Sequence, residues 1–249
     1  MKLHGALGIS TGDVVAFAGA GGKSAAILQV AQELTEAGMT VITVPTTKMF
    51  LGEVERLGSL VISEVPQELA AKVKAALYGG DDSVVAGRAM ISKNRIDGVG
   101  PDVVDDLAPL ADVVLVEADG SRRRPIKGTA THEPVIPASS TLVVAVGNVS
   151  ALGSPVDEDH VHRPAVFSEL TGVSPGQSIT ARAFARALAE GSLAKVPETT
   201  RTAALITGVE PGRPMADASA IARELWRFGL NDVVLTSLPQ NTPSRVWVP

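Results

Sequence analysis

The sequence predicts an α/β fold in which a mostly parallel sheet carries helices on both of its faces. Apolar runs typical of strands alternate with helical patterns along the chain, as in doubly wound sheets. Hydrophobic residues make up 45% of the 249 residues but aromatic ones only 3%, so aliphatic side chains must fill the core. Such filling is typical of buried parallel sheets. We expect residues 1–249 to form a single domain, with an irregular, loop-rich insertion around residues 148–178.

The chain opens with a predicted βαβ unit. Residues 14–18 are a short apolar run, and a helical pattern with its apolar positions on one face follows over residues 23–37. Gly38 stands where a glycine should end that helix. Residues 40–44 are a second, β-branched run. Two strands joined by a helix in this way are expected to be parallel, with a right-handed crossover.

The remaining elements follow the same alternation. Residues 84–96 are predicted to form either a hairpin or an irregular arm, and a short helix is expected around residues 165–170 within the insertion. The other expected helices span residues 66–77, 101–107, 179–190 and 215–228, and the other expected strands span residues 111–116, 142–146, 203–207 and 232–236. In such sheets ligands bind at the carboxyl ends of the strands, so polar clusters after strands are the places to search.

Composition excludes several classes of function. The net charge of −5 gives no basic footprint for nucleic acid. The absence of cysteine excludes disulfides, iron–sulfur clusters and thiolate zinc sites. There is no run of about 18 apolar residues to span a membrane, and the N-terminus lacks the apolar core of a signal peptide. We therefore expect a cytoplasmic protein with no nucleic-acid or membrane partner.

A glycine-rich turn between the first strand and the first helix predicts a phosphate-binding loop. Backbone N–H groups at a helix N-terminus attract anions, a lysine can reach the β- and γ-phosphates, and a serine can bind Mg²⁺. The full pattern would place a glycine where Phe17 stands, so this loop is a shortened form. The alternative is a glycine turn that only packs the helix on the sheet. The loop consists of Gly19, Ala20, Gly21, Gly22, Lys23 and Ser24.

Two carboxylates close the strand expected at residues 111–116. Glu117 and Asp119 should point to the same side, where they could hold Mg²⁺ or take up a proton, unless this is an ordinary solvated strand end. A polar turn after the second strand should lie beside the phosphate loop. We expect metal contacts from Thr46 and Thr47 and a phosphate contact from Lys48, the alternative being a simple polar turn.

Basic residues and histidines complete the candidate site. Arg122 and Lys127 belong to a basic turn that could clamp phosphates or an anionic second substrate, although three consecutive arginines cannot all face one site. His132 and His162 are candidates for proton transfer, and an ordinary loop histidine is the alternative. The acidic and histidine-rich residues 157–163 could bind a divalent cation, but such loops are usually only solvated.

Six segments together resemble the YqeC family, namely residues 19–24, 46–48, 116–121, 125–127, 132–137 and 161–164. The resemblance covers about residues 10–240, and its most specific parts are His-Glu-Pro-Val-Ile-Pro and His-Arg-Pro. It implies a P-loop NTPase-like fold and a role in maturing selenium-dependent molybdenum hydroxylases. Carried over by position, the site adds Glu133 and Arg163 to the residues named above. Asn-Lys-x-Asp, by which many NTPases read guanine, does not follow residues 203–207, so ATP is expected in preference to GTP.

These observations predict an NTP-dependent enzyme. Mg²⁺ would be held by Ser24 and Glu117, and Lys23 would stabilise charge on the phosphates. Asp119, His132 or His162 would handle protons, and the basic turn would hold an anionic cofactor, a cofactor precursor or a molybdenum hydroxylase. Two alternatives stay open: an NTP-driven metallochaperone or insertion switch without further chemistry, and a nucleotide-binding module that does not hydrolyse its ligand.

Overall fold

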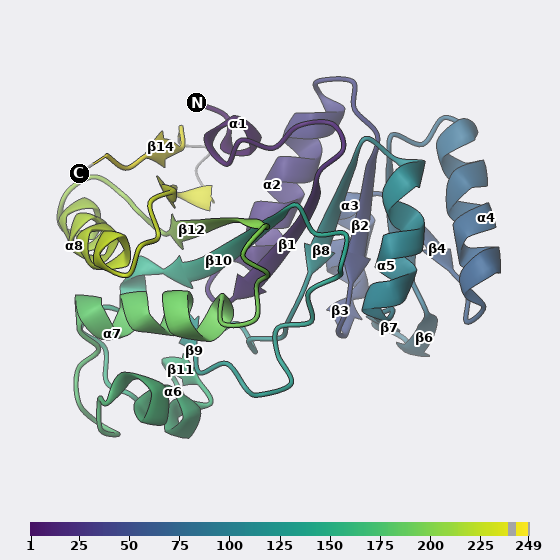
Figure 1. The fold of residues 1–249 in the computed structure, drawn as a ribbon. Helices are drawn as coiled ribbons and strands as arrows, with labels where there is room; N and C mark the ends of the chain where they lie inside the picture. The colour runs from purple at the N-terminus through teal and green to yellow at the C-terminus, as the bar shows by residue number, and fades with distance from the viewer. Residues whose placement is uncertain (239–242, 249) are drawn as a thin grey trace.

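A large sheet forms the centre of the computed structural model, which describes residues 1–238 and 243–248 (Figure 1). Nine strands of the described residues are joined, and each pairs in parallel with its neighbours except β14, which is antiparallel. The predicted mostly parallel α/β sheet is therefore confirmed. The order across the sheet is β14 (Arg245–Val246), β13 (Val233–Leu235), β12 (Arg201–Thr207), β10 (Leu142–Asn148), β1 (Val14–Gly19), β8 (Val113–Glu117), β2 (Val41–Pro45), β5 (Ser83–Gly87) and β4 (Ser59–Ile62).

Helices cover both faces of this sheet, and the alternation of strand residues explains how. In β1, Val15 and Phe17 pack against the helices on one face of the sheet, whereas Ala16 and Ala18 point to the opposite face. One face carries α1 (Leu3–Ala6), α2 (Lys23–Thr35) and α3 (Leu51–Leu57). The other carries α4 (Pro66–Tyr78), α5 (Pro101–Leu107), α7 (Ala181–Arg186) and α8 (Arg213–Arg227).

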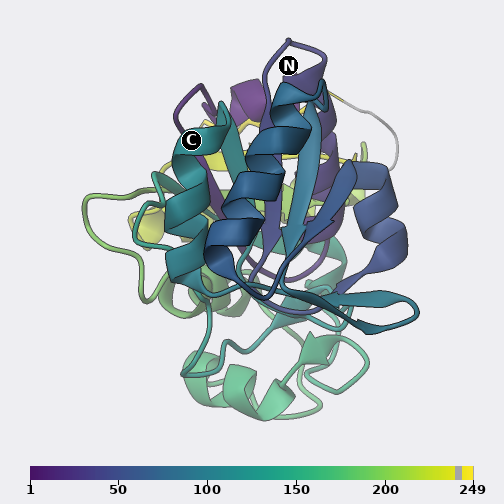
Figure 2. The same cartoon turned by 90° about the vertical axis from the view of Figure 1, so that its right-hand side faces the viewer.

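Two small sheets lie outside the main one, toward the carboxyl ends of its strands. The first contains β3 (Met49–Phe50), β7 (Arg95–Asp97) and β6 (Ala89–Ser92), and Figure 2 shows its β6–β7 hairpin extending away from the body. The second joins β9 (Ile126–Lys127) to β11 (Val161–His162) and is followed by α6 (Pro164–Thr171). Short turns of 3₁₀-helix span Ala108–Leu110 and Val149–Ala151, and a π-helical turn spans Ala187–Ser192.

The predicted elements are found with three differences. Residues 84–96 are neither a plain hairpin nor an arm, because β5 pairs with β2 and β4 in the main sheet before the β6–β7 hairpin begins. The helix expected over residues 179–190 begins at Ala181, because Thr180 caps its first turn. After Arg186 it changes to a π-helical turn. The periodicity did not show several short elements, namely the strands β3, β4, β9, β11 and β14 and the helices α1 and α3. None of the described helices has the length and apolar character needed to cross a bilayer.

Candidate functional site

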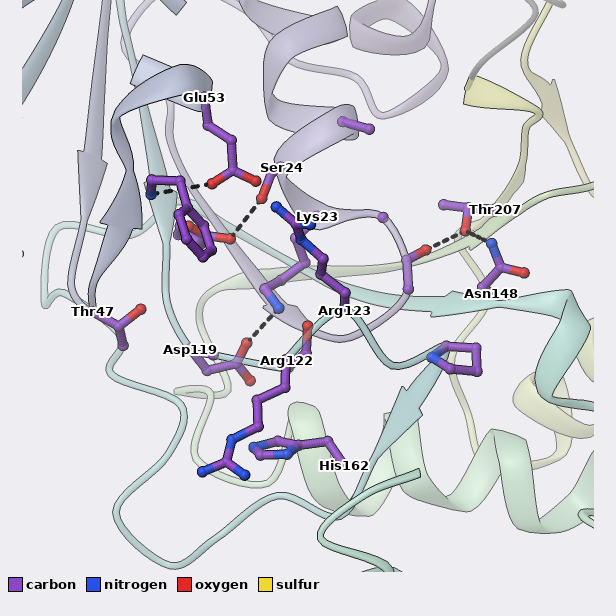
Figure 3. Close-up of a pocket in the computed structure, with 18 of the residues that line it drawn as sticks. Lys23, Ser24, Thr47, Glu53, Asp119, Arg122, Arg123, Asn148, His162 and Thr207 are labelled. Atoms are coloured by element: carbon purple, nitrogen blue, oxygen red, sulfur yellow. Dashed lines mark hydrogen bonds and ion pairs between the residues drawn. The ribbon is translucent and has the colours of Figure 1, made fainter. Parts of the chain in front are cut away.

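A cleft of about 1100 Å³ opens at the carboxyl ends of β1, β8, β10 and β12 (Figure 3). Because these strands are parallel, the loops that follow them meet at one edge of the sheet. The cleft is lined by the predicted phosphate loop, by the turn after β8 and by the segment around β11. It brings together Gly21, Gly22, Lys23, Ser24, Thr47, Lys48, Glu117, Asp119, Arg122, Glu133, His162 and Arg163 among the predicted site residues.

The predicted phosphate loop is shaped by three glycines with positive φ, at 97°, 71° and 126° for Gly19, Gly21 and Gly22. A Cβ atom on Gly19 would stand 2.4 Å from the carbonyl oxygen of Val146, so no larger residue fits there. Helix α2 begins directly afterwards, and none of the described side chains caps its first turn. Its first N–H groups therefore have no intrahelical partner, which is the arrangement that binds anions at a helix N-terminus.

Lys23 and Ser24 begin the helix with their side chains on the cleft side. Lys23 is only 3% exposed, and its Nζ donates to the Gly19 carbonyl oxygen at 2.6 Å. The same Nζ lies 3.0 Å from Asp119 Oδ1, too obliquely for a hydrogen bond, so this contact is an ion pair. Ser24 Oγ donates to Glu117 Oε1 at 3.1 Å. The predicted phosphate loop and the acidic end of β8 are thus in contact.

Asp119 begins a buried chain of alternating charges. Its Oδ2 accepts from Gly19 N at 2.9 Å and from Lys127 Nζ at 3.0 Å. Lys127 Nζ also donates to Glu133 Oε2 at 2.7 Å, and Glu133 in turn accepts two hydrogen bonds from Arg163. The chain runs from Lys23 to Arg163 and so joins the phosphate loop to the small β9–β11 sheet. Lys127 is 2% exposed and lies behind the cleft rather than in its lining.

Glu117 is a buried acid whose ionisation the site opposes. Burial raises its pKa to about 7; Lys23 and the Ser24 hydroxyl act against this, while Glu53 and Asp119 add to it. Together with Ser24, Glu117 offers two oxygen donors of the kind that Mg²⁺ uses beside phosphates. Among the described residues there is no cluster of three or more histidine or acidic side chains that could hold a metal. A cation here would therefore need oxygens from a bound ligand as well.

In the turn after β2, Thr46 has a structural contact, whereas Thr47 and Lys48 line the cleft. Thr46 Oγ1 donates to the Glu117 carbonyl oxygen at 3.0 Å and ties the ends of β2 and β8 together. Thr46 does not line the cleft, and its hydroxyl is occupied by this hydrogen bond. The hydroxyl therefore lies away from the position expected for a metal contact. Thr47 and the exposed Lys48 do line the cleft.

The arginines after β8 point in different directions. Arg123 lies over the ring of Phe50, 5.1 Å from its centroid, and Arg122 reaches toward His162 (Figure 3). Arg124 is turned away, with its guanidinium 3.6 Å from Asp159. Two of the three arginines therefore line the cleft.

The two candidate histidines have different surroundings. His162 lines the cleft, and its pKa is lowered to about 4 by burial and by the neighbouring cations Arg163 and Lys127. His132 is exposed and lies outside the cleft lining. In the segment at 157–163, Asp157 accepts from the His160 ring at 2.7 Å, an ordinary local contact.

Several lining residues were not found from the sequence. Glu53, Phe50 and Arg95 come from α3 and the small β3–β7 sheet, and Arg95 lies 4.1 Å from the centre of the Phe50 ring. Asn148 and Thr207 end β10 and β12, and Asn148 Nδ2 donates to Thr207 Oγ1 at 3.0 Å, while Thr207 donates to Gly21 O. The signal for this last pair was available, because polar residues directly after predicted parallel strands belong to the ligand edge.

Comparison with known proteins places the chain in a family. The family model described as YqeC protein matches residues 15–165, which contain the phosphate loop, the acidic strand end and the arginine turn. The protein named "Uncharacterized protein YqeC" from Escherichia coli (strain K12) is 33% identical over 168 residues. That alignment covers 67% of this chain and 63% of the relative's length. The chain therefore belongs to the YqeC family.

Proposed function

We propose that the cleft binds a nucleoside triphosphate together with Mg²⁺ and hydrolyses it, as a P-loop NTPase does. The observation that carries the proposal is the contact between the two predicted motifs. Lys23 and Ser24 of the uncapped helix α2 lie 3.0 Å and 3.1 Å from the acids Asp119 and Glu117 after β8. A glycine turn that only packed a helix on a sheet would need neither a buried lysine nor a strand end with two acids.

The side chains suit the separate tasks of such a reaction. The N–H groups of the loop and the Lys23 ammonium would hold the phosphates, and Ser24 with Glu117 would hold Mg²⁺, which neutralises phosphate charge. Asp119 contacts Gly19 N and two lysines, so its role in the proposal is to position the loop rather than to carry a proton. Catalysis would then rest on positioning and charge stabilisation, as is general for phosphoryl transfer.

The cellular role is proposed from the sequence resemblance. We propose that the nucleotide, ATP in preference to GTP, drives an accessory step in the maturation of selenium-dependent molybdenum hydroxylases, and that the chain acts there on an anionic cofactor or its precursor. The cleft of about 1100 Å³ is at the upper end of the size range of small-ligand sites, which is compatible with such a second molecule.

Calorimetric titration with ATP and with GTP, each with and without Mg²⁺, tests the proposal. We expect ATP to bind more tightly when Mg²⁺ is present and Lys23→Ala to abolish that binding. A parallel assay of phosphate release measures hydrolysis. If neither nucleotide binds, or if Lys23→Ala binds as the wild type does, the proposal is wrong.

One observation favours a second candidate, an NTP-driven insertion switch without further chemistry. The chain of buried charges joins Lys23 through Asp119, Lys127 and Glu133 to Arg163 on the small β9–β11 sheet. A lysine drawn toward phosphate would change the charge balance along this chain. Hydrolysis that is slow alone and accelerated by a hydroxylase partner would favour the switch, whereas fast hydrolysis dependent on a small molecule would favour the enzyme.

A further inference from the structure

Three arginines of the cleft have backbone conformations that residues other than glycine rarely adopt. Within residues 1–238 and 243–248, the non-glycine residues with positive φ are Arg122, Arg123 and Arg163, at 48°, 61° and 61°. Side chains with a Cβ avoid this region, and where it persists it is concentrated at ligand sites. All three arginines line the same cleft. The fold therefore adopts a strained backbone at the positions from which it directs these guanidinium groups into the cleft.

Positive charge on this side of the cleft exceeds what the buried acids balance. Asp119 and Glu133 are the two acids of the charge chain, and they are shared by Lys23, Lys127 and Arg163. In the described chain Arg122 has no carboxylate partner, and Glu158, the other acid lining this side, is exposed and unpaired. Among these described residues, four cations thus face three acids on this side of the cleft, and Glu158, the third acid, is exposed to solvent and forms no ion pair with Arg122.

His162 lies beside Arg122 and Arg163, and the positive charge of these arginines lowers its pKa. Figure 3 shows the Arg122 side chain reaching to the His162 ring, and Arg163 is the next residue along the chain. Burial, Arg163, Lys127 and Arg122 all lower the His162 pKa, and Glu133 acts against them. At neutral pH the ring is therefore uncharged and can donate one hydrogen bond to an anion held by the guanidinium groups.

We propose that Arg122, His162 and Arg163 form a second oxyanion subsite, which binds a small molecule through a phosphate or carboxylate group. The Arg122 guanidinium offers paired N–H donors that match both groups in a bidentate manner. Arg163 already donates to Glu133 through both of its terminal nitrogens, so it would contribute its charge and its remaining N–H groups. The subsite lies across the cleft from the Ser24 end of the phosphate loop, so both can be filled together (Figure 3). The inference deepens the proposed function, because the second ligand would share the cleft with the nucleotide.

Nuclear magnetic resonance of the full chain labelled with ¹⁵N-histidine tests this directly. The His162 signal is assigned by its loss in His162→Gln. Inorganic phosphate is then titrated in the presence of saturating Mg²⁺ and a non-hydrolysable ATP analogue, which keeps the phosphate loop filled. We expect phosphate to shift the His162 signal saturably and to raise its pKa, because the anion offsets the surrounding positive charge.

Arg122→Gln and Arg124→Gln form a matched pair, since these neighbours share one turn but Arg124 faces Asp159. Arg122→Gln should weaken the phosphate effect about tenfold or more, and Arg124→Gln should leave it unchanged. Equal effects in both variants, or no phosphate-dependent shift in the wild type, would overturn the subsite. If the nucleotide analogue does not bind but phosphate still shifts His162 through Arg122, the subsite stands and the proposed function fails. If the analogue binds and phosphate has no effect on the His162 signal, the subsite fails and the proposed function stands.

Discussion

Asp13 and Glu117 are buried acids at opposite ends of the parallel strands, and their pKa values are shifted in opposite directions. Asp13, next to the amino end of β1, is 7% exposed, and Glu117, at the carboxyl end of β8, is 9% exposed. Burial alone would raise the pKa of both. At Asp13, hydrogen bonds from Thr141, the Ser10 N–H group and Arg201 outweigh it and lower the pKa. At Glu117 no comparable set of donors is present among the described residues, and burial raises the pKa to about 7.

The side chains of Asp13 and Glu117 are similarly exposed, but protein atoms enclose Glu117 more deeply and give it fewer hydrogen-bond donors. This difference separates a structural acid from a candidate functional one. At the amino edge hydrogen-bond donors stabilise the charged form of Asp13, and Thr40 does the same for Asp112. The carboxyl edge leaves Glu117 with one hydroxyl and two neighbouring acids. Groups with perturbed pKa values in a cleft are concentrated at functional sites. The comparison therefore predicts that variants at the two edges will differ in which property they change.

Lys23→Ala should have the largest effect. Removing the buried ammonium takes away charge stabilisation at the phosphates, and we expect Mg²⁺-dependent turnover of ATP to fall about 100-fold or more. Asp112→Asn, at the opposite end of β8, should leave turnover unchanged. Phosphate release under saturating ATP measures both, and similar losses in the two variants would remove the distinction between the edges.

Glu133→Gln should cost the most stability, about 3 kcal/mol, because it leaves Lys127 and Arg163 without their shared carboxylate. Despite burial, the hydrogen bonds and charges of Arg163 and Lys127 lower the Glu133 pKa to about 2 from its usual 4.5. A lowered pKa stabilises the fold above pH 4.5, and that contribution disappears as the pH falls from 4.5 toward 2.

Urea unfolding at pH 7 and pH 3 compares the wild type with Glu133→Gln. The difference in free energy of unfolding should shrink at the lower pH, because at pH 3 the Glu133 carboxyl group of the unfolded chain is already protonated and folding no longer gains its full charge interaction. A difference that stays constant between the two pH values would show that Glu133 acts through packing and not through charge.

Glu117→Gln should gain stability and lose function. An acid whose pKa rises from 4.5 to about 7 destabilises the fold increasingly as the pH rises through that window, fully so above pH 7. The neutral amide avoids this cost and keeps an oxygen for Ser24, so we expect the variant to gain about 2 kcal/mol at pH 8 and nothing at pH 4.5. Thermal unfolding at the two pH values measures this, and a loss of stability at pH 8 would contradict it.

Asp112→Asn should have the smallest effect, a loss of about 1 kcal/mol. The Thr40 N–H and hydroxyl groups donate to the same carboxylate oxygen, Oδ2, so the amide oxygen can accept both contacts and only the contribution of the negative charge is lost. Thermal unfolding at pH 7 gives the value. A gain in stability here would mean that acids at the amino edge are as poorly compensated as Glu117.

The elements and site residues that were predicted from the sequence all depend on patterns among consecutive residues. Strand β1, the glycine turn and the start of α2 at Lys23 are consecutive residues, so one short motif predicted all three. The acids after β8 were found for the same reason. Contacts over long separations were not visible: Glu133 meets Arg163 across 30 residues, and Glu53 reaches the cleft from a seven-residue helix that the periodicity did not show.

Direction was the other property that the sequence could not supply. Thr46 and Thr47 are neighbours of the same type, yet Thr46 bonds to the Glu117 carbonyl and Thr47 lines the cleft. Among three successive arginines, the positive φ of Arg122 and Arg123 decides which side chains enter the cleft. Such backbone conformations are rare for arginine, and no residue pattern signals them.

The most direct test of the account is the affinity for ATP with and without Mg²⁺, measured by calorimetry at pH 8 for the wild type, Glu117→Gln and Asp112→Asn. We predict that Mg²⁺ strengthens ATP binding in the wild type and in Asp112→Asn, and that this gain is lost in Glu117→Gln because the metal loses its carboxylate. The account would be contradicted if Mg²⁺ made no difference to the wild type, or if Glu117→Gln kept the full gain.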